Sequence, residues 1–343
     1  VRAQYTRYII EFRDKAGSPY SLSNPSAYLS SKALARREKF NIPIDSTDLP
    51  VNPAYLDSIR AAGTVTILNT SRWLNQVAIS TTDAAALAHI ATLPFVKTSS
   101  PIANKALPSI YPPGKFNEPQ FDAAYLSLLQ QSSTTNRLDY GNSYGQVHIH
   151  EGEYLHDLGL TGKGMTIAVL DAGFRNYLYN PAFDSIRNNG QILGTWDFVA
   201  NESSVNEDHY HGANCLSIMA ANIPGVLVGT APHADYWLFR TEDVASEYPI
   251  EEQNWVAAAE KADSLGADLI TSSLGYTQFD DPSFDHTYAD MDGRTTIITR
   301  GADMAMKKGM IVTNSAGNEG TNTWRYIVAP ADGDSVLAVG AVD

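Results

Sequence analysis

The second part of the sequence alternates short apolar runs with helix-like segments that end at glycine. Residues 166–170 and 236–239 do not alternate polar with apolar side chains, which is typical of strands buried on both faces. Residues 251–265 carry acidic residues in their first turn and are followed by Gly266, as a helix would be. Residues 299–308 repeat this arrangement before a further glycine. The pattern predicts βαβ units, and hence an α/β fold with a doubly wound, mostly parallel sheet.

The first hundred residues have a different rhythm, in which the pattern changes type repeatedly. Apolar and β-branched runs predict strands, and alanine and leucine at helical spacing predict helices. We expect a small α+β unit with strands at 8–12, 65–69, 73–80 and 96–100, and helices at 31–39 and at 82–93, the second after a capping threonine.

A proline-bearing segment separates these two patterns. It contains Pro108, Pro112, Pro113, Gly114 and Pro119 and then a polar run, a composition typical of linkers. The sequence therefore predicts three parts: an α+β unit at 1–103, a linker at 104–139 and an α/β domain at 140–343.

The composition excludes several classes of function. The formal net charge of −14 argues against nucleic acid and an anionic membrane as partners, because both require clustered lysine and arginine. The single cysteine, Cys215, excludes an internal disulfide framework. No apolar run approaches the roughly 18 residues that span a bilayer, and the start Val1-Arg2-Ala3-Gln4 lacks a signal-peptide core. We expect a secreted or extracytoplasmic protein whose signal peptide has been removed.

Two titratable residues stand where polar groups gather in a parallel sheet, just past the carboxyl ends of strands or at the start of a helix. Asp171 follows the strand 166–170 directly and precedes Ala172-Gly173. His211 opens a run of small and apolar residues that predicts a buried helix, with Gly212 allowing close packing. Taken singly, Asp171 could equally be a turn residue and His211 a hydrogen-bonded loop histidine.

Two further segments follow apolar strands. Ser273-Leu274-Gly275 could pair its backbone with an extended peptide, and Ala316-Gly317 is followed by the amide of Asn318, which could donate to a developing oxyanion. Ordinary turn chemistry would explain each segment seen alone.

Taken together and in chain order, these segments resemble the subtilisin-like serine protease family. The matching stretches are GKGMTIAVLDAG around the aspartate, HGANCLSIMAA from the histidine, SSLG in the substrate-binding segment, SAGNEG in the oxyanion-hole segment, and the strand AVGAVD. The resemblance implies a subtilisin-like catalytic domain that hydrolyses peptide bonds in proteins and requires no cofactor, with structural calcium as an option.

The same resemblance implies a role for each residue. His211 would be the general base, Asp171 would hold its tautomer and stabilise the imidazolium, and Asn318 would bind the oxyanion. Ser273, Leu274 and Gly275, with Ala316 and Gly317, would bind the substrate. The family's serine lies in a Gly-Thr-Ser-Met-Ala segment, which residues 1–343 do not contain. We therefore expect that the sequence ends before that segment and that these residues alone are inactive.

The amino-terminal unit resembles the family's inhibitory prodomain in size, position and order of elements. This implies a prodomain that acts in cis, with residues 97–102 or the linker in the substrate cleft. We expect processing between Asn104 and Arg137.

Other interpretations remain open at this point. His148 and His150 with Glu151 and Glu153, and His209 with His211, have spacings that would suit a metal-dependent hydrolase if they lay on strands. A non-catalytic protein that binds peptides in the same cleft is a second alternative. Cys215, one helical turn after His211, is expected in the core. Acidic residues gather at Asp280, Asp281, Asp285, Asp290 and Asp292, but without the spacing of an EF-hand loop.

Overall fold

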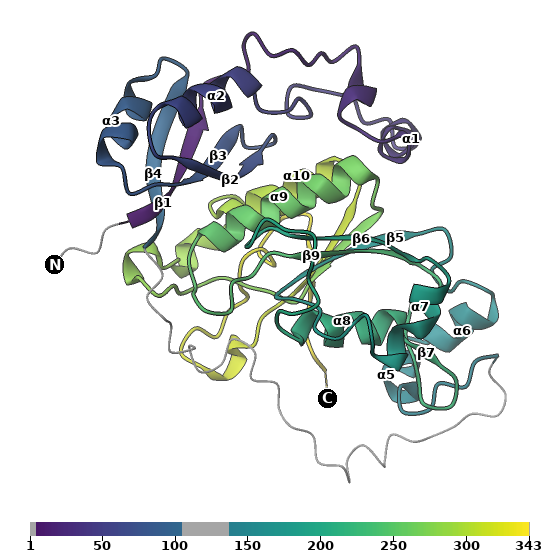
Figure 1. Ribbon diagram of the computed structural model, residues 1–343. Helices are drawn as coiled ribbons and strands as arrows, with labels where there is room; N and C mark the ends of the chain where they lie inside the picture. The colour runs from purple at the N-terminus through teal and green to yellow at the C-terminus, as the bar shows by residue number, and fades with distance from the viewer. Residues whose placement is uncertain (1–4, 105–136, 343) are drawn as a thin grey trace. The chain divides into compact units, whose positions relative to one another are not determined.

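A computed structural model describes residues 5–104 and 137–342 (Figure 1). The chain divides into two compact units. The first unit consists of residues 1–110, 198–202 and 241–343, and the second of residues 111–197 and 203–240. The predicted linker lies mostly outside the described residues, and so does nearly all of the stretch in which processing is expected.

The amino-terminal part of the first unit is a four-stranded antiparallel sheet with the strand order β2-β3-β1-β4. Its elements are β1 (Tyr5–Phe12), α1 (Ser31–Lys39), α2 (Pro53–Ala61), β2 (Thr66–Ser71), β3 (Gln76–Ser80), α3 (Ala84–Thr92) and β4 (Val96–Asn104), with a 3-10 turn at Pro25–Ala27. One face of the sheet packs Ile10 and Ile79 against Ile59 of α2 and Ile90 of α3. The other face packs Ile9 and Ala78 with the apolar side chains that begin α9.

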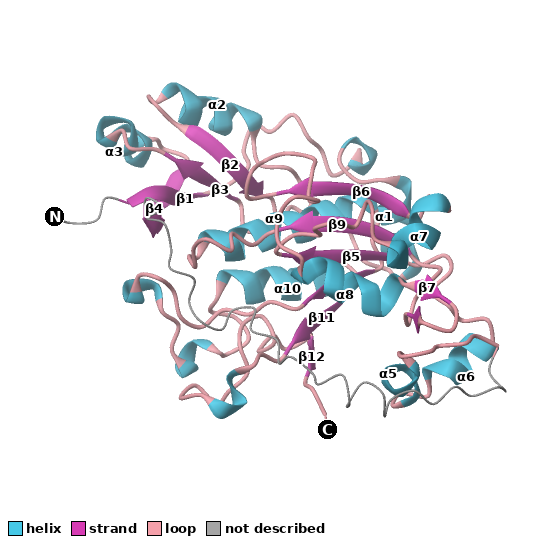
Figure 2. Ribbon diagram, turned by 60° about the horizontal axis from the view of Figure 1, so that its bottom comes forward, coloured by secondary structure: helices cyan, strands magenta, loops and turns pink. Residues whose placement is uncertain are grey.

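The rest of the first unit alternates helices and parallel strands. It contains α9 (Ile250–Leu265), β10 (Leu269–Ser272), α10 (Ile297–Lys307), β11 (Ile311–Ser315) and β12 (Leu337–Val339), with 3-10 turns at Pro282–Phe284, Tyr288–Asp290 and Glu319–Thr321. β11 pairs in parallel with both β10 and β12. The two helices lie side by side (Figure 2), with Val256 of α9 against Gly301 of α10.

The second unit contains three parallel strands in the order β5-β9-β6. They are β5 (Thr166–Asp171), β6 (Ile192–Asp197) and β9 (Asp235–Arg240), accompanied by α5 (Tyr144–His148), α6 (Gly152–Asp157), α7 (Asp184–Asn188), α8 (His211–Ala220), the hairpin β7 (Asn222–Ile223) and β8 (Leu227–Val228), and a 3-10 turn at Pro181–Phe183. All six residues of β5 are buried, as its unbroken apolar run predicts. The predicted α/β class, preceded by an α+β unit, is confirmed.

Two local predictions were wrong. The strand predicted from residue 73 begins at Gln76, because Asn75 adopts a left-handed φ of 52° and forms a turn. The helix predicted at 82–93 begins at Ala84, where Asp83 rather than a threonine caps it by accepting from two backbone N–H groups. His148, which the metal-site alternative would require on a strand, ends helix α5. None of the helices among the described residues is long and apolar enough to span a membrane.

Candidate active site

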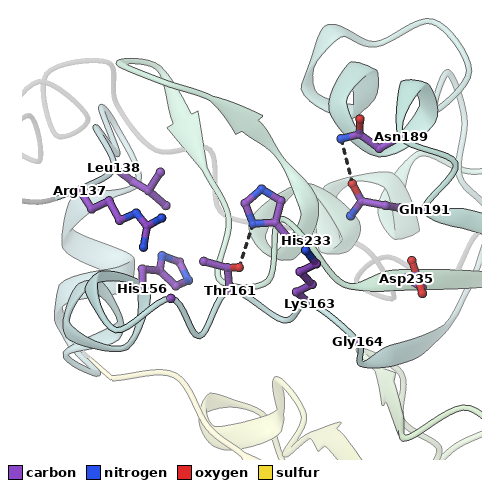
Figure 3. A pocket seen from close by; sticks show the side chains of 11 residues that line it. Arg137, Leu138, His156, Thr161, Lys163, Gly164, Asn189, Gln191, His233 and Asp235 are labelled. Atoms are coloured by element: carbon purple, nitrogen blue, oxygen red, sulfur yellow. Dashed lines mark hydrogen bonds between the residues drawn. The ribbon is translucent and has the colours of Figure 1, made fainter.

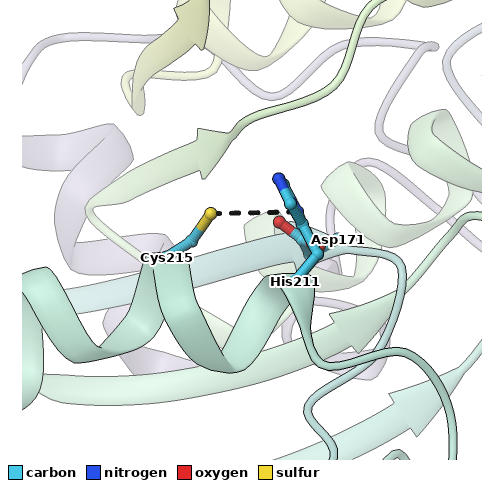
Figure 4. A group of neighbouring side chains, drawn as sticks. All are labelled: Asp171, His211 and Cys215. Atoms are coloured by element: carbon cyan, nitrogen blue, oxygen red, sulfur yellow. Dashed lines mark hydrogen bonds and ion pairs between the residues drawn. The ribbon is translucent and has the colours of Figure 1, made fainter. Parts of the chain in front are cut away.

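Asp171 and His211 lie together in the second unit (Figure 4). Asp171 is the last residue of β5 and is fully buried, and His211 is the first residue of α8. The Nδ1 of His211 lies 2.7 Å from the Oδ1 of Asp171, and the same oxygen accepts from the backbone N–H of Ala172 at 2.7 Å. The strand end and the helix start thus present a carboxylate to an imidazole.

The close approach of α8 to the end of β5 depends on Gly212, which has no side chain. A Cβ placed on Gly212 would lie 2.5 Å from the carbonyl oxygen of Gly173 and 2.8 Å from the Cβ of Asp171. Any larger residue would push α8 away from the turn after β5. The small residue expected after His211 is therefore the feature that permits the contact.

The environment of His211 favours its charged form. Burial lowers its pKa, but the hydrogen bond to Asp171 and the contact with Cys215 outweigh burial and raise the pKa above the ordinary histidine value. At neighbouring His209, burial and the charge of His211 lower the pKa. The Nδ1 of His209 accepts from the backbone N–H of His211 at 3.2 Å, so this side chain caps the start of α8.

Cys215 does not lie in the core, contrary to the prediction. It is only half-buried, and its Sγ lies 3.9 Å from the Nδ1 of His211. Residues four apart on a helix lie on the same face, so the spacing of His211 and Cys215 could have indicated this contact.

The remaining predicted site residues lie in the first unit, just beyond two neighbouring strands. β10 and β11 pair in parallel with Ser272 opposite Asn314, so both strands carry their following segments past the same edge. Ser273, Gly275 and Asn318 are exposed, Ala316 and Gly317 are half-buried, and Leu274 is buried. Val328 fills the space that a side chain on Gly275 or Gly317 would need, which brings the two segments together.

A buried polar network that the sequence analysis missed fixes the ends of these strands. Trp255 Nε1 donates to Ser272 Oγ at 3.1 Å, and Ser272 Oγ donates in turn to Asn314 Oδ1. The Nδ2 of Asn314 donates to the carbonyl of Leu274 at 2.8 Å. The only available signal was a serine and an asparagine at the last positions of two apolar strands.

The residues proposed for a metal-dependent hydrolase do not have the geometry that was expected. His148 stacks on Tyr144 within the helical region and pairs with Glu153, and His209 caps α8. In the described part of the chain, two groups of side chains are close enough to share an ion. They are Asp171 with His211 and Cys215, and the buried carboxylates Glu242, Glu247 and Glu251.

The acidic segment at 280–292 likewise belongs to neither group. Its carboxylates accept from nearby backbone N–H groups: Asp281 from Ser283, Asp285 from Phe279, Asp290 from Thr287 and Asp292 from Arg294. These residues are occupied as turn and helix caps and do not converge on a calcium site.

A cavity of about 750 Å³ lies elsewhere in the second unit (Figure 3). Lys163 lies shortly before β5 and Asp235 begins β9, so the cavity opens at the amino ends of these strands. Asp171 ends β5 and therefore lies at the opposite edge. Two of the lining residues, His233 and Thr161, bond to each other at 2.8 Å.

The sequence of this chain matches two known protein families. Residues 162–343 match the family described as "Subtilase family", and residues 7–120 match "Peptidase S8 propeptide domain, Bacteroidota". The chain belongs to the subtilase family of serine proteases and carries a propeptide domain.

Individual relatives agree with this assignment. The minor extracellular protease Vpr of Bacillus subtilis is 31% identical over 194 residues, which cover 54% of this chain and 21% of that protein. Thermitase of Thermoactinomyces vulgaris is 29% identical over 188 residues, covering 53% and 56%. The chain thus spans less than two thirds of either relative. Fervidolysin of Fervidobacterium pennivorans has a similar fold, with a TM-score of 0.54 and 17% identity over 96% of this chain and 42% of that structure.

Proposed function

We propose that this chain is the propeptide and much of the catalytic domain of a serine endopeptidase that cleaves proteins through an acyl-enzyme. The observation that carries the proposal is the 2.7 Å hydrogen bond between His211 Nδ1 and the buried carboxylate of Asp171. That bond leaves Nε2 of the imidazole to exchange a proton with a nucleophile.

Each residue then has one task. His211 takes the proton of a serine hydroxyl as its oxygen attacks the peptide carbonyl, and it returns the proton to the leaving amine. Asp171 stabilises the imidazolium that forms between these steps. The exposed amide of Asn318 donates to the oxyanion. Residues 1–343 contain no Gly-Thr-Ser-Met-Ala segment, so we infer that they are inactive alone and that the serine must come from outside them.

The substrate would bind as an extended strand. Ser273 and Gly275 are exposed, whereas the intervening Leu274 is buried, and this alternation suits main-chain pairing with a peptide. Ala316 and Gly317 leave room for a substrate side chain beside this strand.

The propeptide would inhibit the enzyme in cis until it is cut between Asn104 and Arg137. A location outside the cytoplasm is consistent with the extracellular relative, the protease Vpr. Calcium dependence stays a prediction, which melting with and without a chelator would test.

A fluorophosphonate probe, which reacts with activated serines, tests the function. The complete encoded polypeptide should be labelled, its His211→Ala variant should not, and residues 1–343 alone should remain unlabelled. Absence of labelling in the complete, processed polypeptide would reject the peptidase and favour the alternative of a non-catalytic peptide-binding protein.

A further inference from the structure

The carboxyl ends of α9 and α10 form one acidic surface in the first unit. It consists of the backbone carbonyl groups of Asp263, Ala267 and Lys308 and the buried carboxylate of Asp263, and we call it the helix-end surface. Gly266 and Gly309, with φ of 84° and 86°, end the two helices in the left-handed conformation. Helix carboxyl ends carry partial negative charge, so this surface favours cations.

The propeptide helix α1 supplies that cation. The guanidinium of Arg36 donates to the carbonyl of Lys308 at 3.1 Å, to the carbonyl of Ala267, and to both the carbonyl and the carboxylate of Asp263. Its side chain is 4% exposed. One side chain of α1 therefore caps both helices at once.

Two more arginines of the propeptide domain converge on the same carboxylate. Arg37 donates to Asp263 Oδ2 at 2.9 Å, to Asp48 Oδ1 at 3.1 Å and to the carbonyl of Lys308. Arg72 donates to Asp263 Oδ2 at 2.5 Å. Asp263 is thus shared by all three guanidinium groups of this cluster.

The balance of buried charge explains why the helix ends take part. The buried cations are Arg36, Arg37, Arg72 and Lys308, and the buried anions are Asp48, Glu260 and Asp263. The cations outnumber the anions, and burial raises the pKa of Glu260, so the two negative helix ends help to offset the excess positive charge. Removing one member would leave an uncompensated charge out of water.

The shape of the surface also fits α1. A Cβ on Gly266 would lie 2.6 Å from the Cβ of Lys32, and a Cβ on Gly309 would lie 2.8 Å from Cδ1 of Ile42. The propeptide domain therefore covers both glycines.

The propeptide sheet also meets α9. Near the start of that helix the contact uses neutral amides, with Gln76 bonded to Gln253 at 2.6 Å and Asn69 to Asn254 at 2.7 Å. Towards its end, Ser71 and the backbone of Arg72 donate to the carboxylate of Glu260. The arginine pair of α1 comes instead from residues 13–52, which connect β1 to α2. The propeptide domain thus contacts α9 through neutral amides near the start of the helix and through charged groups near its end.

We propose that the helix-end surface is a docking site for the arginine pair of α1, and that this contact holds the propeptide on the enzyme after the chain has been cut. The inference rests on the proposed function, because it presupposes a propeptide that is cut from the rest. The partner is defined by its chemistry: a helix that presents two adjacent arginines to two helix carboxyl ends and one buried carboxylate.

The test uses residues 1–343 with a site-specific protease sequence placed within residues 105–136. The folded chain is cut, cleavage is verified by mass spectrometry, and the dissociation rate of the amino-terminal fragment is measured by size-exclusion chromatography over time. Asp263→Asn should accelerate dissociation about a hundredfold, because it removes the charged carboxylate that three buried guanidinium groups share. Arg37→Gln changes α1 and not the helix-end surface. This second variant tests the same contact if the Asp263→Asn variant does not fold.

The matched control is Asp268→Asn. It breaks the ion pair between Lys32 of α1 and Asp268 in the segment after α9, whose side chains are 42% and 25% exposed, so the dissociation rate should stay close to that of the unsubstituted chain. Acceleration below tenfold in a folded Asp263→Asn or Arg37→Gln variant, or equal acceleration in the control, would overturn the proposal. The dissociation measurement does not require peptidase activity. If the amino-terminal fragment dissociates slowly but the complete polypeptide is not labelled by the serine probe, the proposed function is rejected and the docking proposal is retained.

Discussion

Asp171 raises the pKa of His211, because its fully buried carboxylate lies 2.7 Å from Nδ1 of the imidazole. Asp171→Asn should therefore lower the pKa of His211 by about 1 to 3 pH units. NMR titration of the histidine ring in residues 1–343 measures this. An unchanged or higher pKa in the variant would contradict the assigned pair.

The same pair has a stability consequence with a defined sign. Because the folded-state pKa of His211 is raised, the pair contributes its full stability below the ordinary histidine pKa and loses it as pH rises through the folded value. The cost of Asp171→Asn in unfolding free energy should thus be larger at pH 6 than in alkaline solution.

Gly212 tests whether the approach of α8 to β5 depends on close packing. Gly212→Ala should destabilise the chain by about 1–3 kcal/mol, because the new methyl group would overlap the carbonyl of Gly173. Gly320→Ala is the control, since a Cβ there meets nothing within 4 Å. Urea unfolding measures the stability of both variants. Equal free energies of unfolding would contradict the prediction, since α8 could then move away from β5 without loss of stability.

The two strand ends of the first unit should be energetically coupled. Asn314→Ala removes the bonds to Ser272 and to the carbonyl of Leu274 and should cost about 1–3 kcal/mol. In a double-mutant cycle with Ser272→Ala, the double variant should lose less than the sum of the single losses. If the losses of unfolding free energy in the two single variants simply add up in the double variant, Ser272 and Asn314 are not energetically coupled.

The elements themselves were largely predictable from local sequence. α1 has the predicted bounds, and Gly266 ends α9 as expected, because capping and glycine termination are local effects. The pairing of Asp171 with His211 was implied by the family resemblance, and the structure brings the two side chains together. The polar network at Ser272 and Asn314 was missed, since it joins two strands 42 residues apart along the chain.

Histidine and cysteine were harder to place. His148, which the metal-site alternative would require on a strand, ends a helix, and Cys215 faces the imidazole of His211 although its neighbours in sequence are apolar. In both cases the side chain follows the helical period, which short apolar segments do not reveal. The role of Arg36 depends on two helices more than 200 residues away, which no local pattern encodes.

Across the first unit, Asp48 and Lys308 connect segments 260 residues apart at 2.8 Å. Burial raises the pKa of Asp48, but the hydrogen bonds from Lys308 and from the backbone N–H of Asp45, with the charges of Lys308 and Arg37, together outweigh burial and hold the pKa below the ordinary value. This pair therefore stabilises the fold above the ordinary aspartate pKa, and its contribution disappears as pH falls through the lower folded value.

Asp48→Asn should consequently cost about 3–5 kcal/mol at pH 7 and much less in strong acid, because Lys308 and Arg37 would each lose a buried carboxylate partner. Chemical unfolding at both pH values measures the difference. A cost that does not depend on pH would mean that the substitution acts through packing and not through charge.

The central claim is that His211, held by Asp171, is the general base of a peptidase. The most direct measurement is kcat/KM for casein-derived peptides with the complete encoded polypeptide and its His211→Ala variant. The substitution should reduce turnover by about a millionfold, a loss measured in a subtilisin and taken over from it. A variant that retains a tenth or more of the activity would contradict the role assigned to the imidazole.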